Sequence, residues 1–308
     1  MKIIRQSGKS DLATVYLAQL GEDKFVEFAE SLQPPLPREK KWVLLISTMF
    51  GCPVGCRMCD AGTYYRGKLS REEMFAQIDH LVDLRYPERE IASEKFKIQF
   101  ARSGEPALNK EVLTVLSELP QRYRFKSLLP SLSTVAPAGS EDFFQRLLEI
   151  KQRFGDFQLQ FSLHTTDQAL RDRMIPIKKW DFAKISAFGK EFYQAGKRKI
   201  TLNFALGADM PIEPEVLRKY FSPQLFLLKI TPINPTYQAK ANRLDSYLCG
   251  PDGQKAGELE EKLQTAGFEV IISIGELEEN LIGSNCGQMV LQHLKSDNKL
   301  DEGYKYWQ

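Results

Sequence analysis

The chain has 308 residues, of which 43% are hydrophobic and 27% charged, so it can bury a sizeable core and is not an intrinsically disordered protein. The formal net charge of +2 neither requires nor excludes a nucleic-acid partner. No stretch reaches the roughly 20 apolar residues of a membrane span and the first residues lack the apolar core of a signal peptide, so we expect a cytoplasmic protein without a membrane partner.

The first forty residues are expected to form a hairpin and a linker. Residues 13–31 read as two strands joined at Gly21, Glu22 and Asp23, which is a hairpin signal. The proline-rich stretch "QPPLPREKK" then marks a linker. We therefore assign residues 1–40 to an N-terminal β-hairpin with its linker.

From residue 41 the sequence predicts alternating strands and helices. The apolar run Trp42–Thr48 has the length of a buried strand, and Ser70 with Glu73 forms a capping box before the first helix. Five further strand patterns follow: "KFKIQFA", "KSLLPSLST", "FQLQFSLH", "KITLNFALG" and "LFLLKITPI". Helical patterns separate them, which predicts right-handed crossovers and a parallel sheet covered on both faces.

Six units are too few for a closed eight-stranded barrel, so the expected fold is α/β, an open, partial (β/α)6 barrel over residues 41–250. Residues 251–308 are expected to form a helix–strand–helix extension with a polar tail. In parallel α/β folds the site lies at the carboxyl ends of the strands. Polar motifs stand there in this sequence: "SGEP", "ST", "SLH" and "INP".

Three of the five cysteines lie in one loop after the first barrel strand, "GCPVGCRMCDAG". Zinc sites usually pair two cysteine knuckles, whereas the other two cysteines here are distant singletons. The CxxxCxxC spacing of Cys52, Cys56 and Cys59 instead suits a [4Fe–4S] cluster with three thiolate ligands and one open iron.

A CxxxCxxC loop in this position resembles the radical-SAM superfamily. The resemblance implies that S-adenosylmethionine chelates the fourth iron and that an electron from the cluster cleaves it to a 5′-deoxyadenosyl radical. Met58 departs from the pattern, because that position is usually aromatic. A flexible apolar methionine can still pack against an adenine.

Four more motifs are similar to one branch of that superfamily, the RlmN/Cfr-type enzymes that methylate adenine carbons in RNA. They are "SGEPALN", "LST", "SLHTTDQALRDRMIPI" and "PINP". The resemblance implies a SAM-binding role for the residues at the matching positions: Glu105, Pro106, Ser133, Ser162, His164 and Asn234. Taken singly, Glu105 and Asn234 could equally be strand-end caps, and His164 a core histidine.

"SNCGQ" resembles the branch's C-terminal ACGQ, which implies that Cys286 is the thiol that becomes methylated. Taken alone, Cys286 would more often be a buried apolar thiol. In the family a second thiol on the first strand resolves the protein–base crosslink, but Leu45 occupies that position here. Cys249 is the remaining thiol; it is carried as a catalytic candidate, with an inert loop cysteine as the alternative.

The function expected from these features is a methyl-synthase-type radical-SAM methyltransferase acting on an RNA adenine or a similar heteroaromatic carbon, with a reductase or flavodoxin-type electron donor. Few features of the sequence favour RNA binding. A hairpin stands where the family has a helical RNA-binding domain, and "VIISIGELEENLIG" carries acidic residues where arginines would contact phosphates. The basic clusters near Arg122, Lys178 and Lys197 read as solvated helix ends. A peptide or metabolite substrate, or a non-catalytic Fe–S or zinc protein, are the alternatives.

Overall fold

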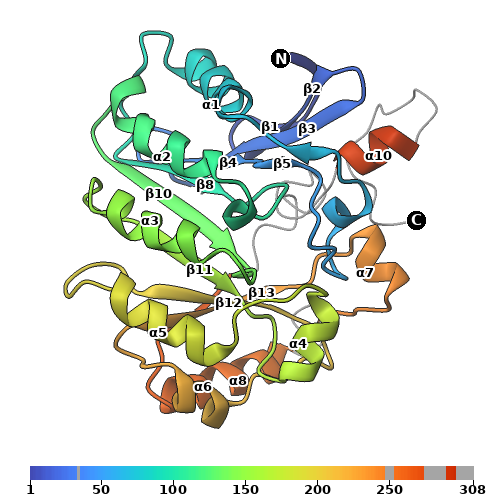
Figure 1. The fold of residues 1–308 in the computed structure, drawn as a ribbon, viewed down its shortest axis with the longest axis vertical. Helices are drawn as coiled ribbons and strands as arrows, with labels where there is room; N and C mark the ends of the chain where they lie inside the picture. Colours follow the sequence, from blue (N-terminus) through green and yellow to red (C-terminus); the bar gives the residue numbers. More distant parts are fainter. Residues whose placement is uncertain (33–34, 247–252, 274–288, 296–308) are drawn as a thin grey trace.

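The computed structural model describes residues 1–32, 35–246, 253–273 and 289–295 (Figure 1). Its strands are β1 (Lys2–Lys9), β2 (Ala13–Gly21), β3 (Lys24–Ser31), β4 (Lys41–Ile46), β5 (Met49–Phe50), β6 (Gly67–Lys68), β7 (Glu90–Ile91), β8 (Lys95–Phe100), β9 (Arg124–Phe125), β10 (Leu128–Thr134), β11 (Gln158–Ser162), β12 (Ile200–Leu206), β13 (Phe226–Pro232) and β14 (Val270–Ile272). Its helices are η1 (Asp60–Thr63), α1 (Arg71–Arg85), η2 (Pro106–Leu108), α2 (Glu111–Arg122), α3 (Glu141–Lys151), α4 (Gln168–Met174), α5 (Phe182–Phe192), α6 (Pro214–Tyr220), α7 (Tyr237–Ala241), α8 (Gly253–Thr265) and α10 (Met289–Lys295).

The predicted partial barrel is confirmed. Strands β4, β8, β10, β11, β12 and β13 pair in that order and all run parallel. The C-terminal extension adds β14 to the same sheet, parallel to β13. The sequence pattern located all six barrel strands because each one alternates with a helix of recognisable length.

The N-terminal strands are joined to the barrel sheet. The predicted hairpin is present as β2 and β3, and the sequence pattern missed β1, which pairs antiparallel with β2. Strand β3 pairs antiparallel with β4, with Ala29 opposite Leu45. The whole forms one ten-stranded sheet, so the hairpin extends the edge of the barrel.

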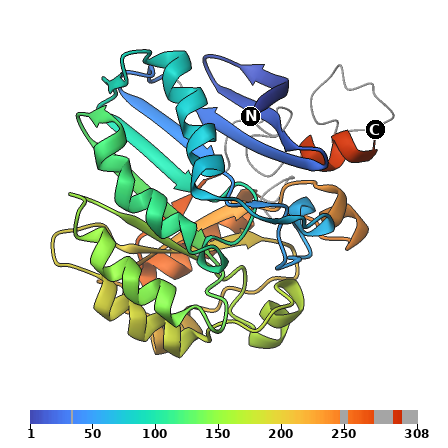
Figure 2. The same cartoon turned by 45° about the horizontal axis from the view of Figure 1, so that its top comes forward.

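The helices of the barrel lie on its outer face (Figures 1 and 2). Every second strand residue faces them and is buried in a common core, as with Trp42, Phe96 and Leu228. The start of α1 shows the predicted capping box: the Glu73 N–H donates to Ser70 Oγ at 3.2 Å, and the Ser70 N–H donates to Glu73 Oε2 at 2.8 Å.

The sequence pattern predicted a parallel sheet covered on both faces, and the barrel helices account for the outer face (Figures 1 and 2). The sheet curls, so the alternate residues of the barrel strands face its inner side. They are mostly polar: Lys41, Lys97, Gln99, Ser131, Ser133, Gln158, Gln160, Ser162, Thr201, Asn203, Lys229 and Thr231. An alternating strand has one face for the helices and one for polar contacts, which is what an enclosed site requires.

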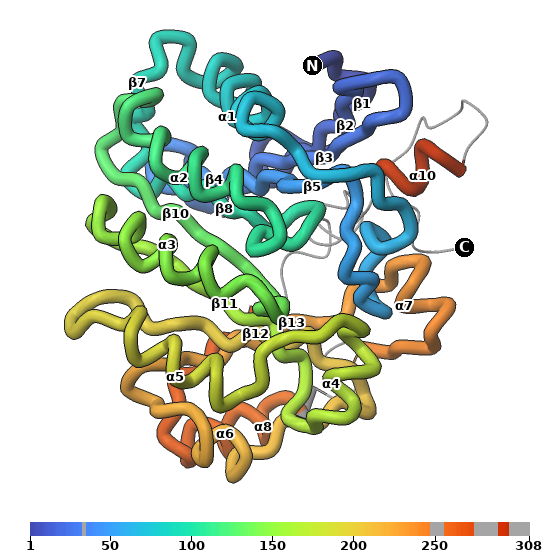
Figure 3. The backbone as a smooth tube through the Cα atoms, in the orientation of Figure 1, coloured from blue at the N-terminus to red at the C-terminus, as the bar shows by residue number. Residues whose placement is uncertain are grey.

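The C-terminal helix α10 returns to the first part of the chain. It lies beside β3 and η1, far from α8 (Figure 3). Among the described residues no helix is long and apolar enough to cross a membrane.

Candidate functional site

The cysteine loop lies between the short paired strands β5 and β6. The Cys52 N–H donates to the Ala61 carbonyl at 2.8 Å and the Cys59 N–H to the Cys56 carbonyl at 3.0 Å, which folds the loop back on itself. None of the three cysteines is in a disulfide, and all are of intermediate exposure. The loop therefore gathers the three thiols predicted as cluster ligands into one segment.

Gly51 makes this loop possible. Its φ is +76°, and a Cβ built there would lie 1.4 Å from the Tyr64 carbonyl oxygen. Only a glycine tolerates both the left-handed backbone and such a close approach. The residue immediately before Cys52 must therefore be a glycine for steric reasons.

The Gly51→Ala variant is expected to lose stability and the native cysteine loop. The strained φ alone costs roughly 1–3 kcal/mol, and the collision with Tyr64 adds to it. Chemical denaturation of the cluster-free protein measures the loss. Gly155→Ala is the control, because a Cβ there meets nothing within 4 Å; equal stability of the two variants would contradict the argument.

The donor set of the loop fits an iron–sulfur cluster. Burial raises the pKa of the Cys52 thiol to about 12, and backbone N–H groups at Val54, Gly55 and Gly104 act in the opposite direction by favouring the thiolate. Burial likewise raises the pKa of Cys56 to about 12, with Cys52 as the next contribution. A bound metal would supply the positive charge that stabilises the thiolate form of these cysteines.

A single metal ion is the alternative to a cluster. No three His, Cys, Asp or Glu side chains in the described parts of the chain lie close enough to hold one ion. A zinc site needs all its sulfurs about 2.3 Å from one centre, whereas a cluster binds each thiolate to a separate iron. N–H groups directed at the sulfur of Cys52 are also the interaction that tunes such clusters.

Glu105 follows β8 and is buried behind three donors. Its Oε1 accepts the Ala107 N–H at 3.0 Å and the Thr134 hydroxyl, and its Oε2 accepts the Val135 N–H at 2.9 Å. Burial raises the pKa of Glu105 to about 7, although the three hydrogen bonds act to lower it. No basic side chain of the described residues contributes to this balance. A buried carboxylate in this setting fits an amino group of a ligand.

The predicted residues at the next strand ends face the same edge. Pro106 is buried and begins η2. Ser133 Oγ, at the end of β10, accepts Gln160 Nε2–H at 3.0 Å, and Ser162 is the last residue of β11. Both serines belong to the inner face, as the motif positions require.

His164 is a neutral imidazole, and its hydrogen bond shows which of its two nitrogens carries the proton. Its Nδ1 accepts the Ala205 N–H at 3.0 Å, so Nε2 carries the proton. Burial, and then Arg171, lower its pKa to about 4. Its φ of +66° is unusual for a residue with a Cβ, and such strain concentrates at functional sites. If His164 were only a core histidine, the hydrogen bond of Nδ1 would be explained but the positive φ would not.

Asn234 lies just past β13 and is 8% exposed. Its carbonyl accepts the Thr236 N–H at 2.7 Å, and Thr236 Oγ1 donates to the Met58 carbonyl at 2.8 Å. Asp60 Oδ1 accepts the Gln238 N–H at 2.9 Å at the start of α7. The loop of Asn234 is therefore tied to the cysteine loop.

Sequence reasoning missed Asp60 and Thr236, although both carried a signal. Thr236 precedes a short helix as an N-cap, with Oγ1 accepting the Ala239 N–H at 3.0 Å. Asp60 stands directly after Cys59, a predicted cluster ligand, and a buried carboxylate needs a hydrogen-bond or charge partner. The partner, α7, is about 177 residues away and could not be inferred.

The loop of Glu105 contacts the cysteine loop through the Gly104 N–H, which is directed at the Cys52 sulfur, and it also contacts the residues just before that loop. The Thr48 N–H donates to the Ser103 carbonyl at 2.7 Å, and Asn109 Nδ2–H donates to the Thr48 carbonyl at 2.8 Å. Farther along, the Arg57 N–H donates to the Met174 carbonyl at 3.0 Å, at the end of α4. The loops predicted as cluster and SAM sites thus meet at one edge of the sheet.

Leu45 lies in β4 on the inner face and packs against an apolar cluster that includes Met289, Val290 and Leu291 of α10. Glu27 Oε2 accepts the Val290 N–H at 3.3 Å, and its carboxylate pairs with Arg102 at 2.8 Å. Helix α10 begins three residues after Cys286. Cys249 and Cys286 themselves lie outside the described residues.

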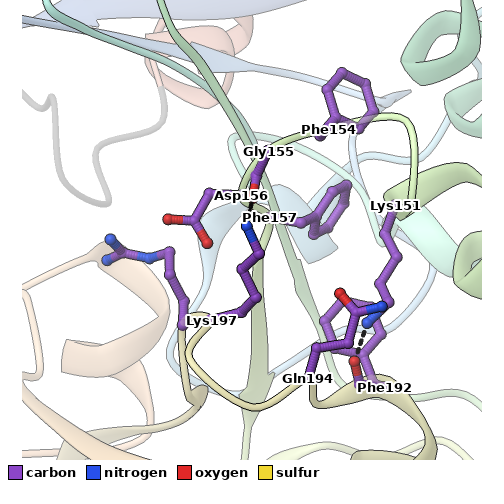
Figure 4. Close-up of a pocket in the computed structure, with 9 residues that line it drawn as sticks. Lys151, Phe154, Gly155, Asp156, Phe157, Phe192, Gln194 and Lys197 are labelled. Carbon is purple, nitrogen blue, oxygen red and sulfur yellow. Dashed lines mark hydrogen bonds between the residues drawn. The ribbon is translucent and has the colours of Figure 1, made fainter.

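Each basic cluster identified in the sequence has at least one member that contacts another part of the protein. Arg122 pairs with Asp79, and Lys179, next to Lys178, pairs with Asp172 at 2.6 Å. A small pocket at the N-terminal ends of β11 and β12 is lined in part by Lys197 and Arg198 of the third cluster (Figure 4). There Lys197 donates to the Gly155 carbonyl at 2.7 Å, which is a structural contact. None of the predicted site residues lines this pocket.

Comparison with known proteins defines the class first. No protein-family model matches the chain. Among solved structures it is similar to a radical SAM methyltransferase from Sphaerobacter thermophilus, with a TM-score of 0.69 and 19% identity over 93% of this chain and 80% of the other. The fold is therefore that of a radical-SAM partial barrel.

Sequence relatives then narrow the family. Proteins named "Probable dual-specificity RNA methyltransferase RlmN" are 28% identical over 78% of this chain in Trichormus variabilis, 30% over 69% in a Nostoc species and 25% over 89% in Desulfitobacterium hafniense. The matches cover 65%, 56% and 76% of those relatives, so the chain spans only part of the length of the first two. In fold and in sequence the chain is similar to the RlmN/Cfr-like branch of the radical-SAM superfamily.

Proposed function

We propose that this chain is a methyl-synthase-type radical-SAM methyltransferase that acts on an RNA adenine or a similar heteroaromatic carbon. The observation that carries the proposal is the meeting of the cysteine loop with the loops of Glu105 and Asn234 at one edge of the sheet, through the Thr48–Ser103 and Thr236–Met58 hydrogen bonds. That edge is where parallel α/β proteins bind their ligands. Relatives named as RNA methyltransferases support the reaction class.

In this proposal Cys52, Cys56 and Cys59 hold a [4Fe–4S] cluster, which when bound supplies the electron that cleaves S-adenosylmethionine. Glu105 accepts the amino group of S-adenosylmethionine, because its buried carboxylate has no cationic partner among the described residues that act on it. Pro106 shapes the turn beneath, and Ser133, Ser162, His164 and Asn234 contribute polar contacts from the neighbouring strand ends. The neutral His164 offers its Nε2–H as a donor.

Cys286 is proposed as the methyl carrier. Its thiolate would displace the methyl group from the sulfonium of one S-adenosylmethionine, leaving S-adenosylhomocysteine and a methylated cysteine. The Glu27–Val290 contact supports this role. It holds helix α10, which begins three residues after Cys286, beside β3 and the cysteine loop. Leu45 lies in the apolar cluster against that helix and cannot act as a resolving thiol.

Anaerobic incubation of the reconstituted protein with S-adenosylmethionine tests the proposal. We expect one added methyl group on Cys286 by peptide mass spectrometry, and 5′-deoxyadenosine once a reductant is present. Cys249→Ala should retain the methylated Cys286 peptide, and Cys286→Ala should contain no methylated peptide. Unmodified Cys286 in the wild-type protein would rule out the carrier role.

The engaged state of the basic clusters favours a second candidate, in which the same radical step acts on a peptide or a small metabolite. Nucleic-acid binding depends on cations that can neutralise phosphates, and such binding weakens steeply with salt. Two results together would favour the first candidate. The purified protein would bind RNA in a salt-dependent way, and cells that lack the protein would lack one modified adenine in their RNA.

A further inference from the structure

Lys179 is a buried lysine in the segment that follows α4. Its side chain is 2% exposed, whereas that of its ion-pair partner Asp172 is 58% exposed. Its Nζ donates to Asp172 Oδ1 at 2.6 Å, to the Ile175 carbonyl at 2.9 Å and to the Ile177 carbonyl at 3.3 Å. An ammonium group has three donors, so these three acceptors satisfy all of them. The positive charge is therefore fixed in one place inside the protein.

The backbone on either side of Lys179 is held as well. The Trp180 N–H donates to the Ala136 carbonyl at 2.8 Å, and the Ala138 N–H donates to the Lys178 carbonyl at 2.9 Å. These bonds join the segment to the loop that follows β10. A lysine can reach the last carbonyls of a helix from the surface, with its ammonium in water. Capping of α4 alone therefore does not explain why this ammonium is buried.

The turn whose carbonyls accept these hydrogen bonds lies against the cysteine loop on both sides of Cys56. The Arg57 N–H donates to the Met174 carbonyl at 3.0 Å. On the other side of the thiol, a Cβ built on Gly55 would lie 4.0 Å from Pro176 Cγ. Pro176 stands between the two carbonyls that bind the ammonium. The buried charge is therefore held near the middle thiol of the loop.

The charge of Lys179 acts on that thiol. Burial, and then Cys52 and Glu105, raise the pKa of Cys56, whereas a backbone N–H and the ammonium of Lys179 lower it. No other cationic side chain of the described residues stands among these main causes. The main causes at Cys52 include the carboxylate of Glu105 but no cation. The negative charge gathered at the loop thus faces one buried positive charge, next to Cys56.

We propose that Lys179 sets the reduction potential of the iron–sulfur cluster by holding this positive charge beside Cys56. The proposal rests on the proposed function, in which an external donor supplies one electron to a cluster held by the three cysteines. The reduced cluster carries one more negative charge than the oxidised cluster, and no bond forms or breaks in the protein. A nearby positive charge stabilises the reduced form and so raises the potential. Asp172 offsets part of this effect from the exposed side.

A redox titration of the reconstituted full-length protein tests this role, with an electrode as the electron source and without S-adenosylmethionine. At a fixed electrode potential, Lys179→Met should lower the ratio of reduced to oxidised cluster by about tenfold, which is about 59 mV for one electron. Lys179→Arg keeps the charge and should stay close to the wild type. The exposed neighbour Lys178 provides the matched control, and Lys178→Met should titrate as the wild type does.

Asp172→Asn separates the charge of Lys179 from its support of the turn. Removing this carboxylate leaves the ammonium uncompensated, so the ratio of reduced to oxidised cluster should rise, opposite to the change in Lys179→Met. If Lys179 only supported the turn, both variants would loosen the same segment and shift the ratio in the same direction. Shifts in the same direction, or an unchanged ratio in Lys179→Met, would overturn the proposal.

Iron and sulfide content shows which variants retain the cluster. If Lys179→Met loses it, the Asp172→Asn titration decides alone: a rise of the ratio supports the proposal, and no change or a fall overturns it. The titration needs neither S-adenosylmethionine nor a methylated Cys286. An unmodified Cys286 would therefore refute the carrier role and leave the result for Lys179 readable.

Discussion

The Cys56→Ala variant is expected to lose nearly all of its cluster iron and sulfide after anaerobic reconstitution. Cys56 is the middle thiol of the loop, and Cys52 lies close enough to act on its pKa. With only two thiolates left, neither a cluster nor a single ion has enough protein ligands. Iron and acid-labile sulfide content, together with the charge-transfer absorption, measure the outcome without any turnover.

Cys249→Ala is the matched control for this loss, because it removes a thiol that lies outside the CxxxCxxC loop. It should reconstitute as well as the wild type. Loss of iron from Cys249→Ala but not from Cys56→Ala would move the metal site away from the loop. A wild-type sample that binds one zinc ion and shows no charge-transfer absorption would instead support the non-catalytic alternative.

The Glu105→Gln variant should bind S-adenosylmethionine more weakly by on the order of 30-fold or more, with its cluster content unchanged. Truncating one side of a buried charged contact costs about 2–5 kcal/mol, and each 1.4 kcal/mol is a factor of ten in affinity. The amide would also direct an N–H group at one of the donors that now meet the carboxylate, Thr134 or Val135. Equilibrium dialysis of the reconstituted protein measures the affinity.

The pH dependence of the same binding follows from the raised pKa of Glu105. That pKa lies at about 7 in the ligand-free protein, so a large share of the carboxyl is protonated below neutral pH. Only the charged form accepts the N–H bonds of an amino group, so binding must release a proton there. Affinity should fall by up to about tenfold per unit as pH drops below 7 and should level off above it.

Glu105→Gln should show little of this slope, because an amide does not titrate in that range. The exposed Glu111→Gln, at the start of α2, is the control and should keep both the affinity and the slope. A wild-type affinity independent of pH between 5 and 8, or an affinity in Glu105→Gln equal to wild type, would remove Glu105 from the amino-group site.

The sequence by itself determined the features that depend on residues close together in the chain. The three cysteine positions, the Ser70–Glu73 capping box and the hairpin turn before Lys24 each involve fewer than ten residues, so their chemistry is visible in the spacing. The alternation of strands and helices also sufficed for the barrel, because a parallel sheet requires one crossover for each strand. The first strand, β1, was missed because it carries charged and polar residues on an exposed edge.

The tertiary structure alone decided which groups meet across the fold. The carboxylate of Glu105 is buried by donors about 30 residues away, and the cysteine loop is held by Thr236 and Asp60 through contacts that span about 178 residues. The polar inner face of the barrel depends on the register that its strands adopt across the sheet. Burial and electrostatic potential depend on distances in space, and no local pattern encodes those distances.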